Sequence, residues 1–84
     1  MINKEILKKQ IIYRSTHRGS KEMDILLGNF VEEYVDKFTD DDLKKLDKIL
    51  EIEDEILQKW YFEKSNDNLI SFNKVTEMLK KFKL

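Results

Sequence analysis

The side chains best suited to chemistry gather in one short segment near the start of the chain. Arg18 offers a planar fork of N–H donors that fits a carboxylate or a phosphate. Gly19 permits a backbone conformation, or a close approach, that a side chain would block. If Gly19 caps a helix, Glu22 stands at the third helical position and can reach back to free backbone N–H groups. The segment is therefore a candidate polar corner, flanked by Lys21 and Asp24, at which a partner could bind.

The one histidine, His17, precedes this corner and is a candidate general base, since imidazole titrates near neutral pH. A lone histidine beside an arginine is more often a surface or hydrogen-bonding residue than a general base. We include His17 among the candidate partner-binding residues. The chain has no cysteine and no second histidine, which excludes a disulfide, a thiolate metal site and a multi-histidine metal site within one chain. It also lacks a phosphate loop and a dinucleotide fingerprint. We therefore predict a binding protein and not an enzyme.

A purely structural interpretation of the same residues remains open. Arg18 could pair with the acidic middle of the chain, since most surface charges serve solvation and weak ion pairs. Gly19 could be only a helix start, and Glu22 only a helix cap. Composition and spacing alone favour this interpretation over partner contact.

The elements that must position the corner are helices. The 84 residues contain no proline and two glycines, with 40% hydrophobic and 39% charged residues. Such a chain can bury a core, whereas sandwiches and barrels need many more turn residues. Apolar residues recur at helical spacing in five segments joined by short polar connections. We expect an all-α five-helix bundle, a single domain over 1–84, with helices at about 4–13, 20–38, 40–50, 54–62 and 69–82.

The expected bundle assigns structural roles to individual residues. Thr39 can cap the third helix together with Asp42, and spacing places Trp60 in the core. Gly28, inside the second helix, suggests close approach by another backbone or by a partner, because a mid-helix glycine costs about 1 kcal/mol relative to alanine. A polar turn is expected at 65–68. The inner faces of the first and last helices are expected to hold Ile6, Leu7 and Ile11, and Phe72, Val75, Met78, Leu79 and Phe82.

The charge is unevenly spread although the net charge is only −1. Residues 1–21 are mostly basic, residues 22–63 are mostly acidic, and residues 64–84 are again mostly basic. A nucleic-acid-binding domain usually has a basic excess throughout, so the acidic centre argues against a nucleic-acid partner. The sequence has no apolar run near 18 residues, so we expect no membrane insertion. The basic start is too poor in arginine and serine for a targeting segment, and we expect the whole chain to be mature protein.

Three ordered blocks of the sequence resemble the SdhE-type succinate dehydrogenase assembly factors, also called flavinylation factors, or assembly factor 2 in mitochondria. The family signature Arg-Gly-x-x-Glu is matched by Arg18, Gly19 and Glu22, within a similar segment from Tyr13 to Phe30. The second block is the acidic helix start at 39–43. The third block ends in a tryptophan and comprises Ile49, Leu50, Glu51, Asp54, Leu57 and Trp60. The resemblance covers about residues 6–62 and is closest to alphaproteobacterial members. The chain departs from the family pattern at Glu55, where many members have proline, and at Tyr61, where many have leucine or isoleucine.

The resemblance implies a function that the composition does not show. Members of this family bind the flavoprotein subunit of succinate dehydrogenase, and in some bacteria that of fumarate reductase, and promote covalent attachment of FAD to a histidine of that subunit. By resemblance we expect the same role here, with no tightly bound cofactor, because the FAD belongs to the client. We expect a cytoplasmic bacterial protein that is monomeric when free. The alternatives are a helical adaptor of another complex and a small FAD carrier.

Overall fold

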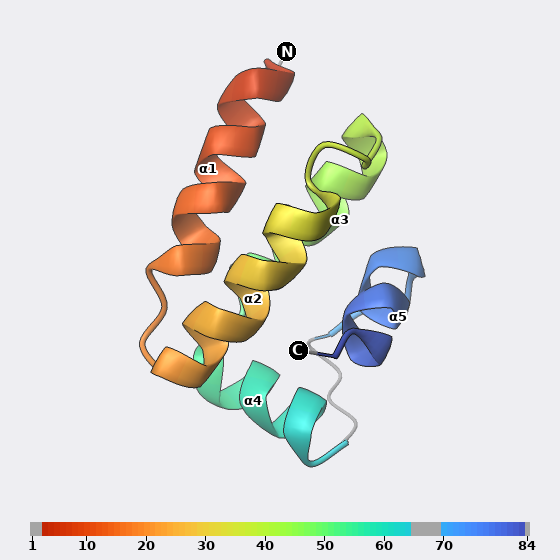
Figure 1. Ribbon diagram of the computed structural model, residues 1–84. Coiled ribbons are helices and arrows are strands. Elements are labelled where there is room, and N and C mark those ends of the chain that lie inside the picture. Colours follow the sequence, from red (N-terminus) through yellow and green to blue (C-terminus); the bar gives the residue numbers. More distant parts are fainter. Residues whose placement is uncertain (1–2, 65–69, 84) are drawn as a thin grey trace.

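The computed structural model describes residues 3–64 and 70–83, and within these ranges all regular structure is helical. The five helices are α1 (Lys4–Thr16), α2 (Lys21–Tyr34), α3 (Asp40–Leu50), α4 (Asp54–Phe62) and α5 (Lys74–Lys81). Helix α1 packs against both α2 and α3, α4 lies across one end of these helices, and α5 packs on α3 (Figure 1). The predicted all-α five-helix architecture is confirmed.

The core is one cluster to which every helix contributes. Its fully buried members include Ile11 from α1, Phe30 from α2, Leu46 from α3, Leu57 from α4 and Leu79 from α5. Trp60 is only 6% exposed, as its spacing predicts. Burial of apolar surface at about 25 cal/mol per Å² is the main term that holds such a bundle together.

The helix starts agree best with the predicted ones where the capping residues are close together in sequence. The side chain of Thr39 accepts a hydrogen bond from the backbone N–H of Asp42, and the carboxylate of Asp42 accepts one from the N–H of Thr39, which completes the predicted capping box of α3. Helix α4 has the predicted bounds. Helix α1 runs three residues further than expected, and α2 ends earlier, at Tyr34.

Two predictions for the inner faces are wrong. Ile6 is 63% exposed because the buried stripe of α1 follows Leu7, Ile11 and Ser15, one residue later. Phe72 is 86% exposed because α5 begins only at Lys74, after the cap Asn73. The expected turn at 65–68 and the expected helix start at 69 lie outside the described residues.

Gly28 lies where α2 meets α1. A Cβ at this position would stand 3.6 Å from the methyl carbon of Thr16, which is an ordinary van der Waals distance. The helices therefore approach closely at this point, yet they leave room for a methyl group. None of the helices in the described ranges has the length and apolar character needed to cross a bilayer.

Candidate partner-binding site

The predicted corner is the turn between α1 and α2, which we call the signature turn and define as residues 17–22. Ser20 caps α2, because its hydroxyl accepts a hydrogen bond from the N–H of Met23 at 3.3 Å. The expectation that Gly19 caps this helix is therefore wrong, and Glu22 stands at the second helical position and not at the third. Glu22 is exposed at the surface.

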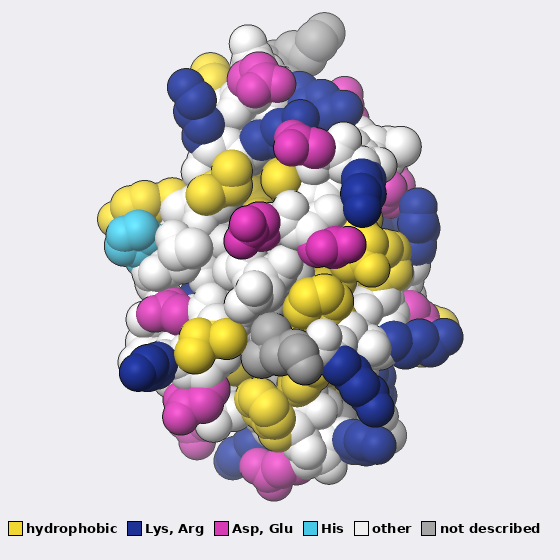
Figure 2. Space-filling model, viewed as in Figure 1, with side chains coloured by type: hydrophobic (Ala, Val, Ile, Leu, Met, Phe, Trp, Pro, Cys, Tyr) yellow, Lys and Arg dark blue, Asp and Glu magenta, His cyan; other side chains and the backbone are white. Residues whose placement is uncertain are grey.

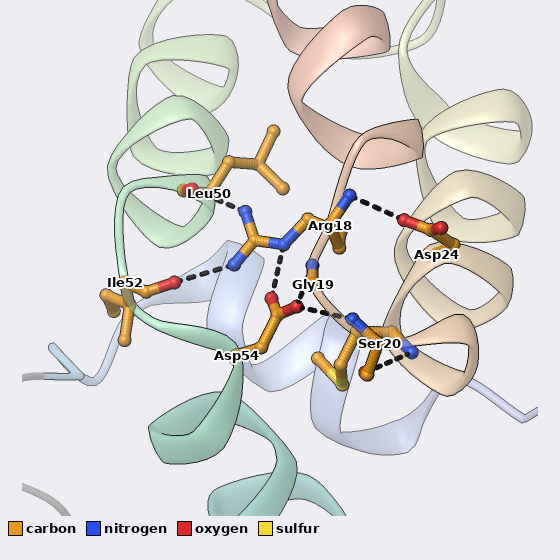
Figure 3. A network of polar contacts seen from close by, with 8 residues as sticks. Arg18, Gly19, Ser20, Asp24, Leu50, Ile52 and Asp54 are labelled. Carbon is orange, nitrogen blue, oxygen red and sulfur yellow. Dashed lines mark hydrogen bonds and ion pairs between the residues drawn. The ribbon is translucent and has the colours of Figure 1, made fainter.

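Arg18 turns inward, against the junction between α3 and α4 (Figure 3). Its Nε donates to Oδ1 of Asp54 at 2.5 Å, while Nη1 and Nη2 donate to the carbonyls of Leu50 and Ile52, each at 2.6 Å. The last carbonyls of a helix have no partner within that helix, and a cation at this end is favoured by the helix dipole. Arg18 therefore completes the C-terminal end of α3 from the neighbouring turn.

Asp54 holds the other side of the signature turn. Its Oδ2 accepts hydrogen bonds from the backbone N–H groups of Gly19 at 2.5 Å and Ser20 at 3.0 Å (Figure 3). Asp54 is the first residue of α4, where a negative charge is favoured by the helix dipole. One carboxylate thus joins the start of α4 to the guanidinium and the backbone of the turn.

This pairing places Arg18 out of direct reach. The side chain of Arg18 is 8% exposed and that of Asp54 is 17% exposed. Of the two interpretations of Arg18 from the sequence, the geometry supports pairing with the acidic centre of the chain. A buried arginine with carbonyl and carboxylate partners can shape a binding surface from beneath, whereas it offers little to a visiting protein.

Gly19 is needed for space. Its φ lies outside the left-handed region, so its backbone conformation is open to other residues. A Cβ at position 19, however, would stand 3.3 Å from Oδ2 of Asp54, which is tighter than most such contacts. A side chain at this position presses on the carboxylate that holds the turn.

The outer side of the signature turn is open to solvent. His17, Gly19, Lys21 and Glu22 are exposed, while Asp24 is half-buried and accepts a hydrogen bond from the backbone N–H of Arg18 at 2.6 Å. The turn thus presents an imidazole, an ammonium and a carboxylate close together in sequence. These groups suit recognition of polar and charged groups on a partner.

His17 is held against an aromatic ring. Its imidazole stacks on Tyr13, with ring centroids 3.9 Å apart and planes 15° from parallel, and Nδ1 lies 2.8 Å from the carbonyl oxygen of Tyr13. The histidine side chain (cyan) lies at the surface in Figure 2. Tyr13 is itself 63% exposed. Tyr13 was not among the predicted site residues, although its spacing of four residues from His17 is the signal that predicts this contact on a helix.

Comparison with known protein families identifies the family to which the chain belongs. The family model described as "Flavinator of succinate dehydrogenase" matches residues 9–83, which include the whole signature turn and Asp54. The chain belongs to this family. The resemblance inferred from the Arg-Gly-x-x-Glu signature is confirmed.

Individual relatives agree with this assignment. The chain is 40% identical over 55 residues to the "FAD assembly factor SdhE" of Acetobacter pasteurianus, which covers 66% of this chain and 50% of that protein. It is 39% identical over 61 residues to the "Succinate dehydrogenase assembly factor 2, mitochondrial" of Arabidopsis thaliana, which covers 73% of this chain and 32% of that protein. The chain thus spans about half or less of these two relatives. No solved structure gave a significant match.

The described part of this family member presents polar and charged side chains at its surface. It contains no group of three or more histidine or acidic side chains that could hold a metal ion. Basic and acidic side chains alternate over the face seen in Figure 2, without a broad patch of one sign. The face seen in Figure 2 therefore lacks the broad basic patch that is typical of nucleic-acid-binding domains.

Proposed function

We propose that the chain binds the flavoprotein subunit of succinate dehydrogenase and promotes covalent attachment of FAD to it. The observation that carries the proposal is the family match over residues 9–83. In this role the chain is an assembly factor and not an enzyme. The FAD belongs to the client, and the chain needs no cofactor of its own.

The outer side of the signature turn is the proposed client contact. His17, Gly19, Lys21 and Glu22 reach solvent, and Asp24 borders them. We propose that these residues touch the client, while Arg18 supports the surface from beneath through its buried contacts with α3 and α4. The support for this assignment is that exposed polar groups and a rigid internal clamp meet at one turn.

The chain can accelerate flavin attachment without contributing a reacting group. The flavin and the client histidine carry the chemistry, and the proteins supply orientation and electrostatics. An assembly factor that binds one client conformation better than others increases the population of that conformation. A difference of about 1.4 kcal/mol in binding changes the minor population about tenfold. We propose that the chain favours the conformation in which the client histidine meets the flavin.

Reconstitution tests this proposal. Apo flavoprotein subunit is incubated with FAD, with and without the chain, and covalently held flavin is measured by fluorescence after denaturation. We expect the chain to increase the rate of covalent attachment. An unchanged rate and yield would contradict the proposed function. The same assay with a fumarate reductase flavoprotein tests whether it is a second client.

A titration of the isolated chain with FAD separates this role from that of a flavin carrier. We expect unchanged flavin fluorescence, because FAD is held by the client. Quenching at stoichiometric FAD would favour the carrier. Recovery of a tagged chain with an unrelated complex, in place of the flavoprotein, would favour an adaptor. Sedimentation of the free chain tests the expectation that it is a monomer.

A further inference from the structure

Asp54 stands outside the proposed client contact, yet it touches three consecutive residues of the signature turn. It lies on α4, 34 to 36 residues further along the chain than Arg18, Gly19 and Ser20. Its carboxylate accepts hydrogen bonds from N–H groups of all three residues. We infer that Asp54 is a positioning residue that sets the shape of the client-binding turn. This inference rests on the proposed function and adds a determinant to it.

The two oxygens of the carboxylate have separate tasks. Oδ1 faces the guanidinium of Arg18, and Oδ2 faces the backbone N–H groups of Gly19 and Ser20 (Figure 3). Every neighbour is therefore a donor, which a carboxylate can satisfy on both sides. An asparagine offers one oxygen and one NH₂ group, so one side of the turn would meet a donor in place of an acceptor.

Asp54 is tied to the junction between α3 and α4 through its pairing with Arg18. Arg18 pairs with Asp54 and also donates to the carbonyls of Leu50 and Ile52, where α3 ends. The turn is thus fastened to the α3–α4 junction through one guanidinium and one carboxylate. Consequently the orientation of the outer residues, including Glu22, depends on a junction that need not touch the client.

A positioning role differs from a simple contribution to stability. If Asp54 only stabilises the fold, its replacement lowers the folded fraction, and the folded molecules bind the client as before. If Asp54 positions the turn, folded molecules of the variant bind the client less tightly. The decisive measurement is therefore the affinity of fully folded protein.

Asp42→Asn is a matched control for Asp54→Asn. Asp42 is also an aspartate in the first turn of a helix, and it also accepts a backbone hydrogen bond and contacts a cation, Lys74. It belongs to the start of α3, at the opposite end of α3 from the α3–α4 junction and the signature turn (Figure 1). The two variants make the same chemical change and differ in what the carboxylate holds.

Binding to the apo flavoprotein is measured for both variants by titration at a temperature where circular dichroism shows each to be folded. We expect Asp54→Asn to weaken client affinity about tenfold and Asp42→Asn to leave it within about twofold of the wild type. At saturating concentrations of the chain we expect both variants to restore the wild-type rate of flavin attachment. Equal affinities of the two variants would overturn the positioning role.

A second readout does not depend on the client. Amide hydrogen exchange is followed by NMR at Gly19 and Ser20 in the free chain. We expect Asp54→Asn to accelerate exchange of these two amides by tenfold or more, while Asp42→Asn leaves them unchanged. Unchanged exchange in Asp54→Asn would overturn the inference. If the wild-type chain fails to bind the flavoprotein, the proposed function fails, and the exchange rates still decide whether Asp54 shapes the turn.

Discussion

Asp42 and Asp54 stand in the first turns of neighbouring helices and use their carboxylates in opposite ways. Asp42 closes a capping box with Thr39, three residues earlier, and its other contact is an ion pair with the exposed Lys74 of α5. Asp54 gives its carboxylate to Arg18, Gly19 and Ser20, which lie on another part of the chain. The first arrangement fixes where one helix begins. The second fixes how two distant parts of the chain meet, and it does so at the proposed client-binding turn.

The two arrangements differ in what a substitution would disturb. The capping box is local, so its loss affects mainly the start of α3. The Arg18–Asp54 pair joins the signature turn to α3 and α4, so loss of one partner leaves a largely buried charge and free carbonyls. We therefore expect the second arrangement to be more sensitive to substitution.

The largest effect is expected for Arg18→Ala. The substitution leaves Asp54 without its cation and the carbonyls of Leu50 and Ile52 without their donor, and we expect a loss of about 3 kcal/mol in the free energy of unfolding. Urea unfolding followed by circular dichroism measures this loss. A loss no greater than that of Asp42→Asn would remove the difference between the two arrangements.

A smaller and pH-dependent effect is expected for Asp42→Asn. Burial raises the pKa of Asp42, but the hydrogen bonds from Thr39 and the contact with Lys74 outweigh it, and the pKa is lowered below 3.8. Because the pKa is lower in the folded state, ionised Asp42 stabilises the fold above pH 3.8, and this stabilisation is lost as the pH falls through the lowered pKa.

Urea unfolding across this range checks the effect of Asp42→Asn. At neutral pH we expect the variant to be less stable by about 1 kcal/mol, because it loses a negative charge in the first turn of a helix and beside Lys74. The difference from the wild type shrinks as the pH falls below 3.8. A difference that stays constant with pH would show that the charge of Asp42 contributes nothing.

The two glycines sharpen the comparison through substitutions of opposite sign. Gly19→Ala places a Cβ 3.3 Å from the Asp54 carboxylate, so we expect a loss of about 1 kcal/mol. Gly28→Ala places a Cβ at an ordinary distance from Thr16 inside a helix, so we expect a gain of about 0.5–1 kcal/mol. Thermal unfolding of both variants gives the signs. A gain at Gly19 would mean that the turn tolerates a side chain without moving Asp54.

The smallest effect is expected for Arg14→Ala. Arg14 lies on α1, four residues before Arg18, and its Nη1 pairs with Asp47 of α3 at 2.7 Å. Its side chain is 35% exposed, compared with 8% for Arg18. Partly exposed ion pairs contribute about 0–1 kcal/mol, so we expect a loss below 1 kcal/mol. A loss as large as that of Arg18→Ala in the same urea experiment would show that burial does not separate the two pairs.

The sequence predicted the features of the fold that depend on near neighbours. The bounds of α4, the capping box at Thr39 and the burial of Trp60 follow from residues within a few positions of one another. Ile6 was misplaced because an apolar residue at the edge of a helical stripe can face either way, and only packing decides. Phe72 was misplaced because α5 begins two residues later, at Lys74.

For the candidate site, too, the sequence predicted what depends on neighbouring residues, which is the position of the turn. Arg18, Gly19 and Glu22 marked the signature turn through their types and spacing. Nothing local showed that Arg18 turns inward, because its partner Asp54 lies 36 residues away. The sequence therefore located the turn, whereas the structure divides its residues into an outer surface and an inner clamp.

The central claim is that the outer side of the signature turn contacts the client flavoprotein. Charge reversal at Glu22 tests it most directly, with Glu32→Lys as control, since both glutamates are exposed on α2. The measurement is the initial rate of covalent flavin attachment to apo flavoprotein at a limiting concentration of each variant. The account predicts that Glu22→Lys lowers this rate about tenfold or more and that Glu32→Lys retains the wild-type rate. Wild-type rates with both variants would contradict the account.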